Sequence, residues 1–344
     1  MSGMNYLQWL STNTQTAWWH DSGDPLELQT ALANGAVGVT TNPILCAEAL
    51  KNNKDFWRQE IREALEADKT PRARAESLMK IVVTYAARQM EPIHRKTAGK
   101  HGYACAQVDP SCAGSRVEMY DQARRFSAWA ANIAVKLPAT RAGMDVMEKC
   151  CAEGMTVVMT VSFSVAQVMA IGKRYKQVQQ AAKRGAKVGG CFSVMMIGRV
   201  DDYLREAFAD NEEPVSESEL RMAGLSIVKR ASQLYRQDRF EAQLLVAALR
   251  GNYHMIGLAG GDLTMSIHPA HQRTLVDEQV EQRERFQELI PLALQEKLCR
   301  IPEFRKAYDP LGLSENEMIT FGLTQRTLAQ FVETGWKLLE QFQP

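Results

Sequence analysis

Residues 133–161, IAVKLPATRAGMDVMEKCCAEGMTVVMTV, contain the strand–helix–strand pattern that decides the fold. IAVKLP (133–138) and the β-branched run MTVVMTV (155–161) are short and apolar, as buried strands are. The segment 141–152 between them predicts a helix that Gly154 closes. Two apolar strands joined by a helix predict a parallel β–α–β unit.

The same alternation extends along the chain in both directions. Six further segments predict strands, namely TAWWHD (16–21), VGVTTN (37–42), YACAQVD (103–109), VGGCFSVMMIGR (188–199), LLVAAL (244–249) and DLTMSI (262–267). Helices are expected from Asp24 and Pro25 to Gly35, over about 44–65 and 71–98, and after a capping box at Ser216 and Glu219. Eight strand candidates separated by helices predict an α/β fold, a (β/α)8 TIM barrel, with an open doubly wound sheet as the alternative.

The end of the chain has a different pattern. Residues beyond about 270 are expected to be helical, and a second capping box at Ser314 and Glu317 is expected to start a long amphipathic helix. We therefore predict a single domain over residues 1–344, with a barrel core over about 15–270 and a C-terminal helical extension over about 271–344. The extension is expected to pack on the barrel and to reach its mouth.

The composition favours a globular protein with a small-molecule ligand. Hydrophobic residues make up 45% of the 344 positions, and 41 Lys plus Arg balance 40 Asp plus Glu. A chain this close to neutral has no overall field that would attract nucleic acid or an anionic membrane. The seven cysteines form no CxxC pair, and no leader or long apolar segment stands out, so buried thiols and a cytoplasmic location are predicted. No cofactor is expected, and a homo-oligomer is compatible with the sequence.

Polar residues follow the apolar strands at their carboxyl ends, where the chemistry of such barrels lies. They are Asp21, Thr40, Thr41, Asn42, Gln107, Asp109, Lys136, Thr160, Arg199 and Arg250. Strand alternation puts Lys136 on the face opposite Val135 and Leu137. Burial disfavours the charged form of a lysine, and the neutral amine is the nucleophile that imine formation with a carbonyl substrate requires.

Other interpretations of these residues stay open at this stage. Asp21 is a candidate for moving protons to and from substrate hydroxyls, but a structural Lys136–Asp21 ion pair is equally compatible with the pattern. Thr160 alone is typical of an ordinary strand, and Gln107 and Asn42 alone are typical of turns or caps. His268 and His271 raise the alternative of a metal-dependent hydrolase. No carboxylate stands at ligand spacing, so we predict no metal and interpret both histidines as loop or helix-start residues.

Five segments resemble the transaldolase family in order and spacing over roughly 15–270. They are HDSGDP (20–25), GVTTNPIL (38–45), VKLPATRAG (135–143), EGMTVVMTVSFSVAQ (153–167) and IGRVDDY (197–203). The resemblance implies Lys136 as the imine former, Asp21 as the general acid/base and Thr160 as the residue that places a relay water. It also implies Asn42, with Thr41 beside it, as a ligand of donor hydroxyls, and Arg199 and Arg250 as ligands of the substrate phosphate.

The chain departs from the family pattern at five positions. The usual glutamate of the third strand is Gln107, as in the smaller fructose 6-phosphate aldolase relatives, and this amide can orient a water but cannot accept a proton as a base. Val158 replaces an asparagine, Val194 and Ala248 replace two serines, and Met196 replaces an aromatic residue. The donor and phosphate pockets are therefore expected to be more apolar than in the family.

The resemblance implies a Schiff-base enzyme that transfers a dihydroxyacetone unit, a three-carbon ketol, between sugar phosphates. An aldolase of the same mechanism, a lyase, is the closest alternative, and Gln107 favours it. A catalytically impaired sugar-phosphate-binding homologue is a third interpretation, against which the presence of both Lys136 and Asp21 argues. Both the pentose phosphate pathway and a specialised catabolic route are compatible with the sequence.

Overall fold

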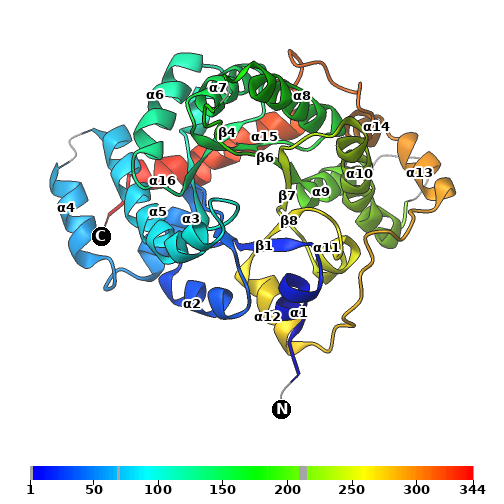
Figure 1. Cartoon of the computed structure of the whole chain (residues 1–344), viewed down its shortest axis with the longest axis horizontal. Coiled ribbons are helices and arrows are strands. Elements are labelled where there is room, and N and C mark those ends of the chain that lie inside the picture. The colour runs from blue at the N-terminus through cyan, green and yellow to red at the C-terminus, as the bar shows by residue number, and fades with distance from the viewer. Residues whose placement is uncertain (1–2, 68–69, 184, 209–214, 344) are drawn as a thin grey trace.

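The chain folds as a closed barrel of eight parallel strands in the computed structural model, which describes residues 3–67, 70–183, 185–208 and 215–343 (Figure 1). The strands are β1 (Ala17–His20), β2 (Gly38–Val39), β3 (Tyr103–Gln107), β4 (Ile133–Pro138), β5 (Thr156–Thr160), β6 (Cys191–Met196), β7 (Gln243–Ala247) and β8 (Thr264–Ile267). Because β1 pairs with both β2 and β8, the sheet has no free edge. The predicted (β/α)8 TIM barrel is confirmed, and the open doubly wound sheet is wrong.

Helices surround this barrel, and more of them follow the last strand. In chain order they are α1 (Tyr6–Asn13), α2 (Pro25–Ala33), α3 (Pro43–Asn52), α4 (Arg58–Ala67), α5 (Pro71–Lys96), the 3-10 turn η1 (Pro110–Cys112), α6 (Arg116–Ser127), α7 (Arg141–Ala152), α8 (Val165–Ala181), α9 (Ile197–Phe208), α10 (Glu217–Asp238), α11 (Asn252–Leu258), α12 (Pro269–Asp277), α13 (Leu292–Cys299), α14 (Pro302–Tyr308), α15 (Gly322–Phe331), the π-helical turn η2 (Val332–Trp336) and α16 (Lys337–Glu340).

Local sequence signals account for several of these element ends. Asp24 accepts hydrogen bonds from backbone N–H groups at the start of α2, and Gly35 follows that helix with a φ of 93°. Ser216 and Glu219 form the predicted capping box of α10. β4 and α7 have the predicted bounds, and Gly154 follows α7 with a φ of 83°.

The strand register decides which side chains enter the barrel. Lys136 is paired with Gln107 on β3 and with Val158 on β5, so these three residues share the inner face near the carboxyl ends of their strands. Towards the other end, the rings of Trp19 and Phe192 lie 4.8 Å apart and those of Tyr103 and Phe192 lie 5.7 Å apart. These three aromatic side chains fill the lower interior and leave the upper end for a site.

The predicted bounds of one helix and one strand need correction. The helix expected over 44–65 is two helices, α3 and α4, because residues 53–57 leave the helical path: Asn53 turns its side chain to Asp24, and Trp57 is buried. The strand predicted over 188–199 is shorter, because β6 spans Cys191–Met196 and α9 begins at Ile197. Arg199 therefore lies in the first turn of a helix.

The second predicted capping box does not start a helix. Only half of the motif forms: the Ser314 backbone N–H donates to Glu317 Oε2, but the Ser314 hydroxyl also donates to that carboxylate, and the Glu317 N–H donates to the Ser314 carbonyl instead of the hydroxyl. The chain then forms turns that bury Met318 and Phe321, and α15 begins only at Gly322. Burial of these two apolar side chains has overridden the local signal.

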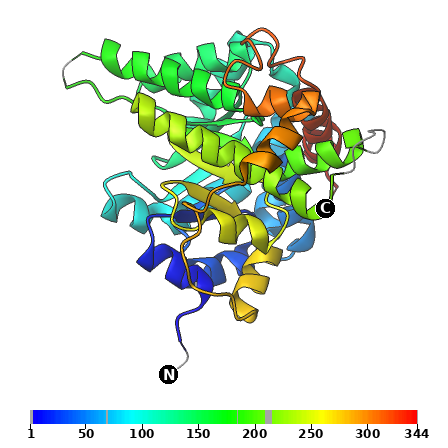
Figure 2. The same cartoon turned by 90° about the vertical axis from the view of Figure 1, so that its right-hand side faces the viewer.

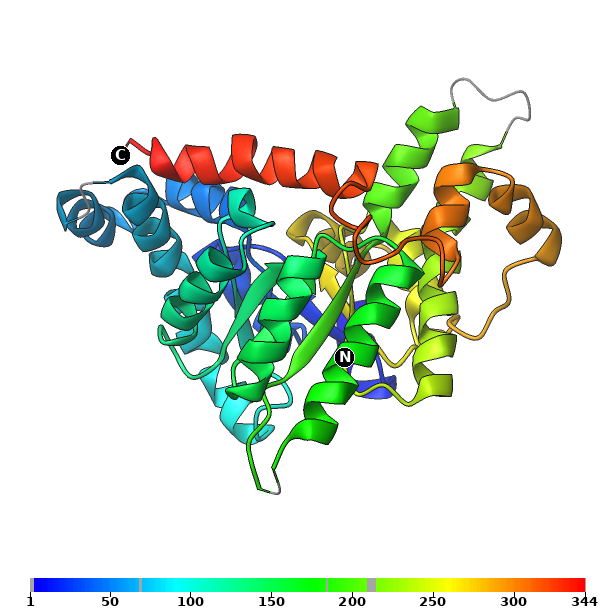
Figure 3. The same ribbon diagram turned by 90° about the horizontal axis from the view of Figure 1, so that it is seen from above.

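The C-terminal extension follows the outside of the barrel and then crosses its upper end. Residues 278–291 run along the outside from α12 to α13, where Phe286 is buried (Figure 2). Seen from above, α15, η2 and α16 then form one long rod across the barrel (Figure 3). A Cβ atom added at Gly335 in η2 would lie 2.9 Å from the side chain of Ile44 at the start of α3. The expectation that the extension packs on the barrel and reaches its mouth is confirmed.

All seven cysteines are free thiols, and six of them are buried. None of the described helices combines the length and the apolar composition needed to cross a membrane.

Candidate active site

A cavity of about 180 Å³ lies at the carboxyl ends of the strands, and we call it the mouth cavity. Its polar lining residues are Asp21, Thr40, Asn42, Lys136, Thr160, Arg199, Arg250 and Ser266. Its apolar lining residues include Val158, Val194, Met196, Leu245, Ala248 and Phe331. The polar residues come mainly from β1, β2, β4 and β8, and the apolar residues come mainly from β5, β6 and β7. Four of the predicted departures from the family pattern line this cavity, namely Val158, Val194, Met196 and Ala248.

Lys136 has its amine inside the barrel without a carboxylate partner. The residue is 8% exposed, and its Nζ donates a 2.9 Å hydrogen bond to the backbone carbonyl of Thr41. Among the ion pairs between described residues, none joins Lys136 to Asp21 within 4.0 Å. The interpretation of these two residues as a structural ion pair is therefore wrong. An amine held by a single neutral acceptor stays available for chemistry in the cavity.

Asp21 is held by two hydroxyl groups in series. The Thr40 hydroxyl donates to Asp21 Oδ1 at 2.6 Å, and the hydroxyls of Thr40 and Ser266 lie 2.6 Å apart. Because a threonine hydroxyl has one proton and gives it to Asp21, the second contact requires that Ser266 donates to Thr40. The chain from Ser266 through Thr40 fixes one carboxylate oxygen, and no described residue donates to the other. That second oxygen is the one available to accept a proton.

Asn42 and Thr160 also face the mouth cavity. Asn42 caps α3, because its Oδ1 accepts a 3.0 Å hydrogen bond from the backbone N–H of Leu45. The cap occupies the amide oxygen and leaves the amide N–H groups for a hydroxyl of a ligand. Thr160 ends β5, and among the described residues its hydroxyl donates only to the sulfur of Met196, at 3.9 Å. Both predicted site residues are thus brought to the cavity that holds Lys136.

Two other predicted site residues do not line the mouth cavity. The Thr41 hydroxyl is buried and donates to the carbonyl of Cys105 at 2.7 Å, so Thr41 contacts Lys136 only through its own carbonyl. Gln107 is buried at the end of β3, beside Lys136 in the register. Its Oε1 has no hydrogen-bond partner among the described residues, an unusual state for a buried oxygen that a water or a ligand hydroxyl would relieve.

Arg199 and Arg250 line both the mouth cavity and a second cavity of about 310 Å³, which we call the outer cavity. Arg199 donates to Gln330 of α15 at 2.6 Å, and its guanidinium lies 5.4 Å from the ring centre of Phe331. None of the described carboxylates is within ion-pair distance of it. Burial, reinforced by the nearby charge of Arg250, lowers the pKa of Arg199 to about 10. This guanidinium therefore lies in a positive and partly desolvated environment that an anion would stabilise.

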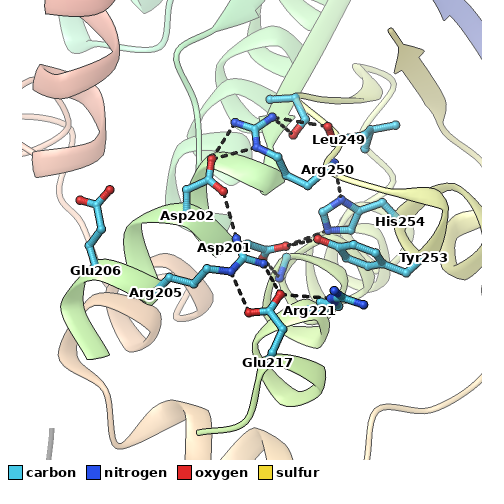
Figure 4. Close-up of polar contacts among 12 residues, drawn as sticks. Asp201, Asp202, Arg205, Glu206, Glu217, Arg221, Leu249, Arg250, Tyr253 and His254 are labelled. Atoms are coloured by element: carbon cyan, nitrogen blue, oxygen red, sulfur yellow. Dashed lines mark hydrogen bonds and ion pairs between the residues drawn. The ribbon is translucent and has the colours of Figure 1, made fainter. Parts of the chain in front are cut away.

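Arg250 has a different environment, which Figure 4 shows. Its Nε donates to Asp202 Oδ2 at 2.8 Å, and its Nη1 donates to the carbonyl of Ala248 at 3.0 Å. A guanidinium that already has a carboxylate has less to offer an incoming anion. Arg199 is thus the stronger of the two candidate phosphate ligands.

The sequence pattern missed three residues of this site. Ser266 alternates inward on β8 as Lys136 does on β4, and this periodicity is a signal that could have identified it. Gln330 and Phe331 reach the site from the extension, more than 60 positions beyond the last strand, and no local pattern marks them.

The two histidines after β8 have structural roles. His268 caps α12 by accepting from the backbone N–H of Ala270, and His271 contacts the carbonyl of Leu249. The described part of the chain contains no group of three or more His, Cys, Asp or Glu side chains placed to hold a metal ion.

The sequence matches a known family over almost its full length. The profile described as Transaldolase/Fructose-6-phosphate aldolase matches residues 18–341, so the match extends through the C-terminal extension rather than ending near 270. A protein named Transaldolase from Neisseria meningitidis serogroup A is 29% identical over 189 residues, which cover 54% of each chain. A Transaldolase from Thiobacillus denitrificans is 28% identical over 260 residues, or 72% of each chain. The match to the Neisseria protein thus spans about half of its length.

Proposed function

Because the chain belongs to the transaldolase/fructose-6-phosphate aldolase family, we propose that it is an enzyme that forms an imine through Lys136 and transfers a dihydroxyacetone unit between sugar phosphates. The observation that carries the proposal is the mouth cavity, which holds the Lys136 amine without a carboxylate partner and the Asp21 carboxylate with one free oxygen. A nucleophilic amine and a proton acceptor in one partly apolar cavity are the two groups that imine-based cleavage needs.

The first half of the proposed reaction breaks a carbon–carbon bond. The Lys136 amine adds to the ketose carbonyl carbon, and water leaves to give a protonated imine. Asp21 takes the proton of the hydroxyl group on the carbon two positions from the imine carbon, and that oxygen becomes the aldehyde carbonyl. The bond between the hydroxyl-bearing carbon and the carbon next to the imine breaks. The released electron pair moves into the imine and forms an enamine on Lys136. The chain of Ser266 and Thr40 holds Asp21 in position for this proton transfer.

The second half distinguishes transfer from cleavage. In transfer, the enamine carbon attacks the carbonyl of an acceptor aldehyde, Asp21 returns the proton to the new hydroxyl, and water releases the product ketose. In the alternative lyase, Asp21 returns its proton to the enamine carbon through a water molecule, and hydrolysis of the imine releases dihydroxyacetone. Thr160, whose hydroxyl faces the cavity and has a weak contact with the sulfur of Met196, is the residue we assign to placing the water in both cases.

Arg199 is the main phosphate ligand in this proposal. Its guanidinium has no carboxylate among the described residues, and it lies where the mouth cavity joins the outer cavity. A phosphate there would lie at one end of the mouth cavity, with Lys136 and Asp21 towards the other. Val194 and Ala248 line the same cavity and offer no hydroxyl donors, so we expect a preference for phosphorylated sugars that is weaker than serines at these positions would give.

The lyase alternative rests on Gln107. An amide beside Lys136 can orient a water but cannot hold a proton, and the unpartnered Oε1 of Gln107 is a place for that water. Free dihydroxyacetone should be measured with and without an acceptor aldehyde. Release that an acceptor does not suppress would favour the lyase. Little free dihydroxyacetone, with a new ketose formed only when an acceptor is added, would favour the transferase.

Borohydride trapping tests the imine itself. Incubation with a panel of ketoses and borohydride, followed by intact mass and peptide mapping, should show one reduced adduct on Lys136. Lys136→Met should abolish it. Lys229→Met is the matched control, because Lys229 is also a partly buried lysine that donates to backbone carbonyls, but on α10 outside the barrel. Trapping that survives in Lys136→Met, or an adduct that maps to another lysine, would refute the proposed mechanism.

A further inference from the structure

Two consecutive aspartates on α9, Asp201 and Asp202, follow Arg199 by two and three positions and contact the segment that carries Arg250 (Figure 4). Asp201 does not line either the mouth cavity or the outer cavity. Its partner His254, on α11, does not line them either, and both side chains are 0% exposed. A buried ionisable pair this close to two candidate phosphate ligands calls for an explanation other than contact with substrate.

The hydrogen bonds of His254 determine its tautomer. The backbone N–H of Arg250 donates to Nδ1 of His254 at 3.2 Å, so Nδ1 carries no proton. The ring proton of neutral His254 is therefore on Nε2, which lies 3.0 Å from Asp201 Oδ2. The Nε2–H is not aligned for a straight hydrogen bond, although the separation is that of a close polar contact. His254 thus connects the backbone of Arg250 to the carboxylate of Asp201.

Asp201 is itself anchored from two further directions. Its Oδ1 accepts a 3.0 Å hydrogen bond from the backbone N–H of Gly224 on α10, and its Oδ2 accepts from the Tyr253 hydroxyl at 3.2 Å. Burial raises the pKa of Tyr253 to about 12, which keeps that hydroxyl protonated as a donor. Asp201 therefore has donors on both oxygens and needs no ligand from outside the protein.

Asp202 holds the other end of Arg250. Its Oδ2 accepts from Arg250 Nε and lies 2.8 Å from Arg250 Nη2, while its Oδ1 accepts from Arg205 at 3.0 Å. The backbones also meet closely, because a Cβ atom added at Gly198 would lie 2.0 Å from the carbonyl oxygen of Ala248. One turn of α9 thus contacts the guanidinium of Arg250 and the backbone of Ala248 two positions before it.

We propose that Asp201, acting through His254, and Asp202 are positioning residues that set the spacing between Arg199 and Arg250, and that recognition of a phosphate monoester or inorganic phosphate depends on this spacing. The inference rests on the proposed function only for the identity of the phosphate-bearing substrate. Arg199 belongs to α9, and Arg250 belongs to the loop before α11. The β6–β7 pairing and the approach of Gly198 to Ala248 hold the two backbones together, and the contacts of His254 and Asp202 then position the Arg250 segment and its guanidinium relative to α9. Phosphate recognition by two guanidinium groups requires that both donor sets reach the same anion.

Three substitutions of His254 separate its two contacts. His254→Asn offers a side-chain oxygen near the place of Nδ1, so it can accept from the Arg250 N–H. His254→Gln offers an amide nitrogen near the place of Nε2, so it can donate to Asp201. His254→Leu retains neither contact and keeps a similar apolar volume. We expect the preference for a phosphorylated over an unphosphorylated ketose, as a ratio of kcat/KM values, to fall about tenfold in His254→Leu. It should be only partly restored in His254→Asn and in His254→Gln, because each keeps one of the two contacts.

Direct binding of inorganic phosphate, measured by calorimetry, gives a second readout that does not need turnover. Its Kd should rise about tenfold in His254→Leu, in parallel with the kinetic preference. An equal loss of kcat/KM for both ketoses with unchanged phosphate binding would show that His254 supports the fold or the chemistry in general. That result would overturn the inference, and so would wild-type phosphate binding in all three variants.

Asp202→Ala keeps the inference testable even if the buried variants do not fold. Simple electrostatics predicts that removal of a carboxylate beside an anion site tightens phosphate binding. The positioning role predicts the opposite sign, a weaker affinity, because Arg250 loses the group that orients it. Tighter binding in Asp202→Ala would therefore refute the spacing argument. Failure of borohydride trapping in the wild type, with phosphate binding still weakened in these variants, would refute the proposed function alone.

Discussion

Arg199→Met is expected to weaken recognition of phosphorylated substrates without weakening the fold. The substitution removes a guanidinium that faces both cavities and that has no carboxylate partner among the described residues. Methionine keeps an unbranched side chain of similar length, so the packing against Phe331 is largely retained. Arg199→Lys is the matched control, because it keeps the charge and loses the planar fork.

The expected magnitude follows from the contacts of Arg199. A hydrogen bond to a charged group contributes about 1.5–3 kcal/mol, and each tenfold change in affinity corresponds to about 1.4 kcal/mol. Loss of one such bond to phosphate should raise KM for a phosphorylated ketose by about ten- to 150-fold. Stability should change little. The pKa of Arg199 is lowered to about 10, so below about pH 10, where Arg199 is charged in both the folded and the unfolded chain, its burial costs stability. Removal of this cost offsets the lost contact with Gln330.

Steady-state kinetics with a phosphorylated ketose and its unphosphorylated counterpart provide the assay, with thermal unfolding as the control for the fold. The phosphorylated substrate should lose most of its advantage in Arg199→Met and part of it in Arg199→Lys. Equal losses of kcat/KM for both substrates would show that Arg199 supports the fold and does not bind the phosphate. No change for either would mean that the phosphate binds elsewhere, and the assignment of Arg199 would have to be withdrawn.

Four further predictions concern the rest of the site and the fold. Asp21→Asn should still form the imine slowly but lose bond cleavage, and an unchanged kcat would remove Asp21 from proton transfer. Gln107→Glu should raise the ratio of transfer to cleavage. An equal ratio in the variant and the wild type would show that residue 107 does not decide whether the enamine is transferred or protonated. Gly143→Ala should lower the melting temperature, because the new Cβ would lie 1.9 Å from the carbonyl oxygen of Pro138; an unchanged melting temperature would contradict this. The pKa of Glu219 is lowered to about 2, mainly by the ammonium group of a lysine on α13, so its stabilising effect is complete above about pH 5 and is lost towards pH 2. Glu219→Gln should therefore lower the melting temperature near neutral pH and leave it unchanged near pH 2; a difference that persists at pH 2 would disprove this account.

The barrel was predictable where local and global preferences agree. IAVKLP and the helix after it have the predicted bounds, because the apolar run, the β-branched residues and the closing glycine all favour the same structure. The inward position of Lys136 followed from strand alternation alone. Convergence of Asp21 and Lys136 on one cavity needed only the closure of the sheet, which the number of strands already indicated.

The rest of the site could not be predicted, because it depends on contacts between distant segments. Only half of the capping box at Ser314 forms, and burial of Met318 and Phe321 decides where the next helix begins. Gln330 reaches Arg199 only because the extension crosses the mouth. Lys136 and Asp21 do not form an ion pair, and this decides between two functional interpretations. It depends on a few ångströms of side-chain position, which the hydrophobic periodicity of a sequence does not determine.

The aromatic side chains of Trp19, Tyr103 and Phe192 close the lower end of the barrel, and this has a kinetic consequence for the proposed chemistry. Substrates and products then share one opening to the mouth cavity. The aldehyde formed by the first half-reaction has to leave through the same opening by which the acceptor arrives, and that opening is narrowed by Phe331. Donor and acceptor should therefore alternate rather than bind together, and initial-rate plots at several acceptor concentrations should give parallel lines.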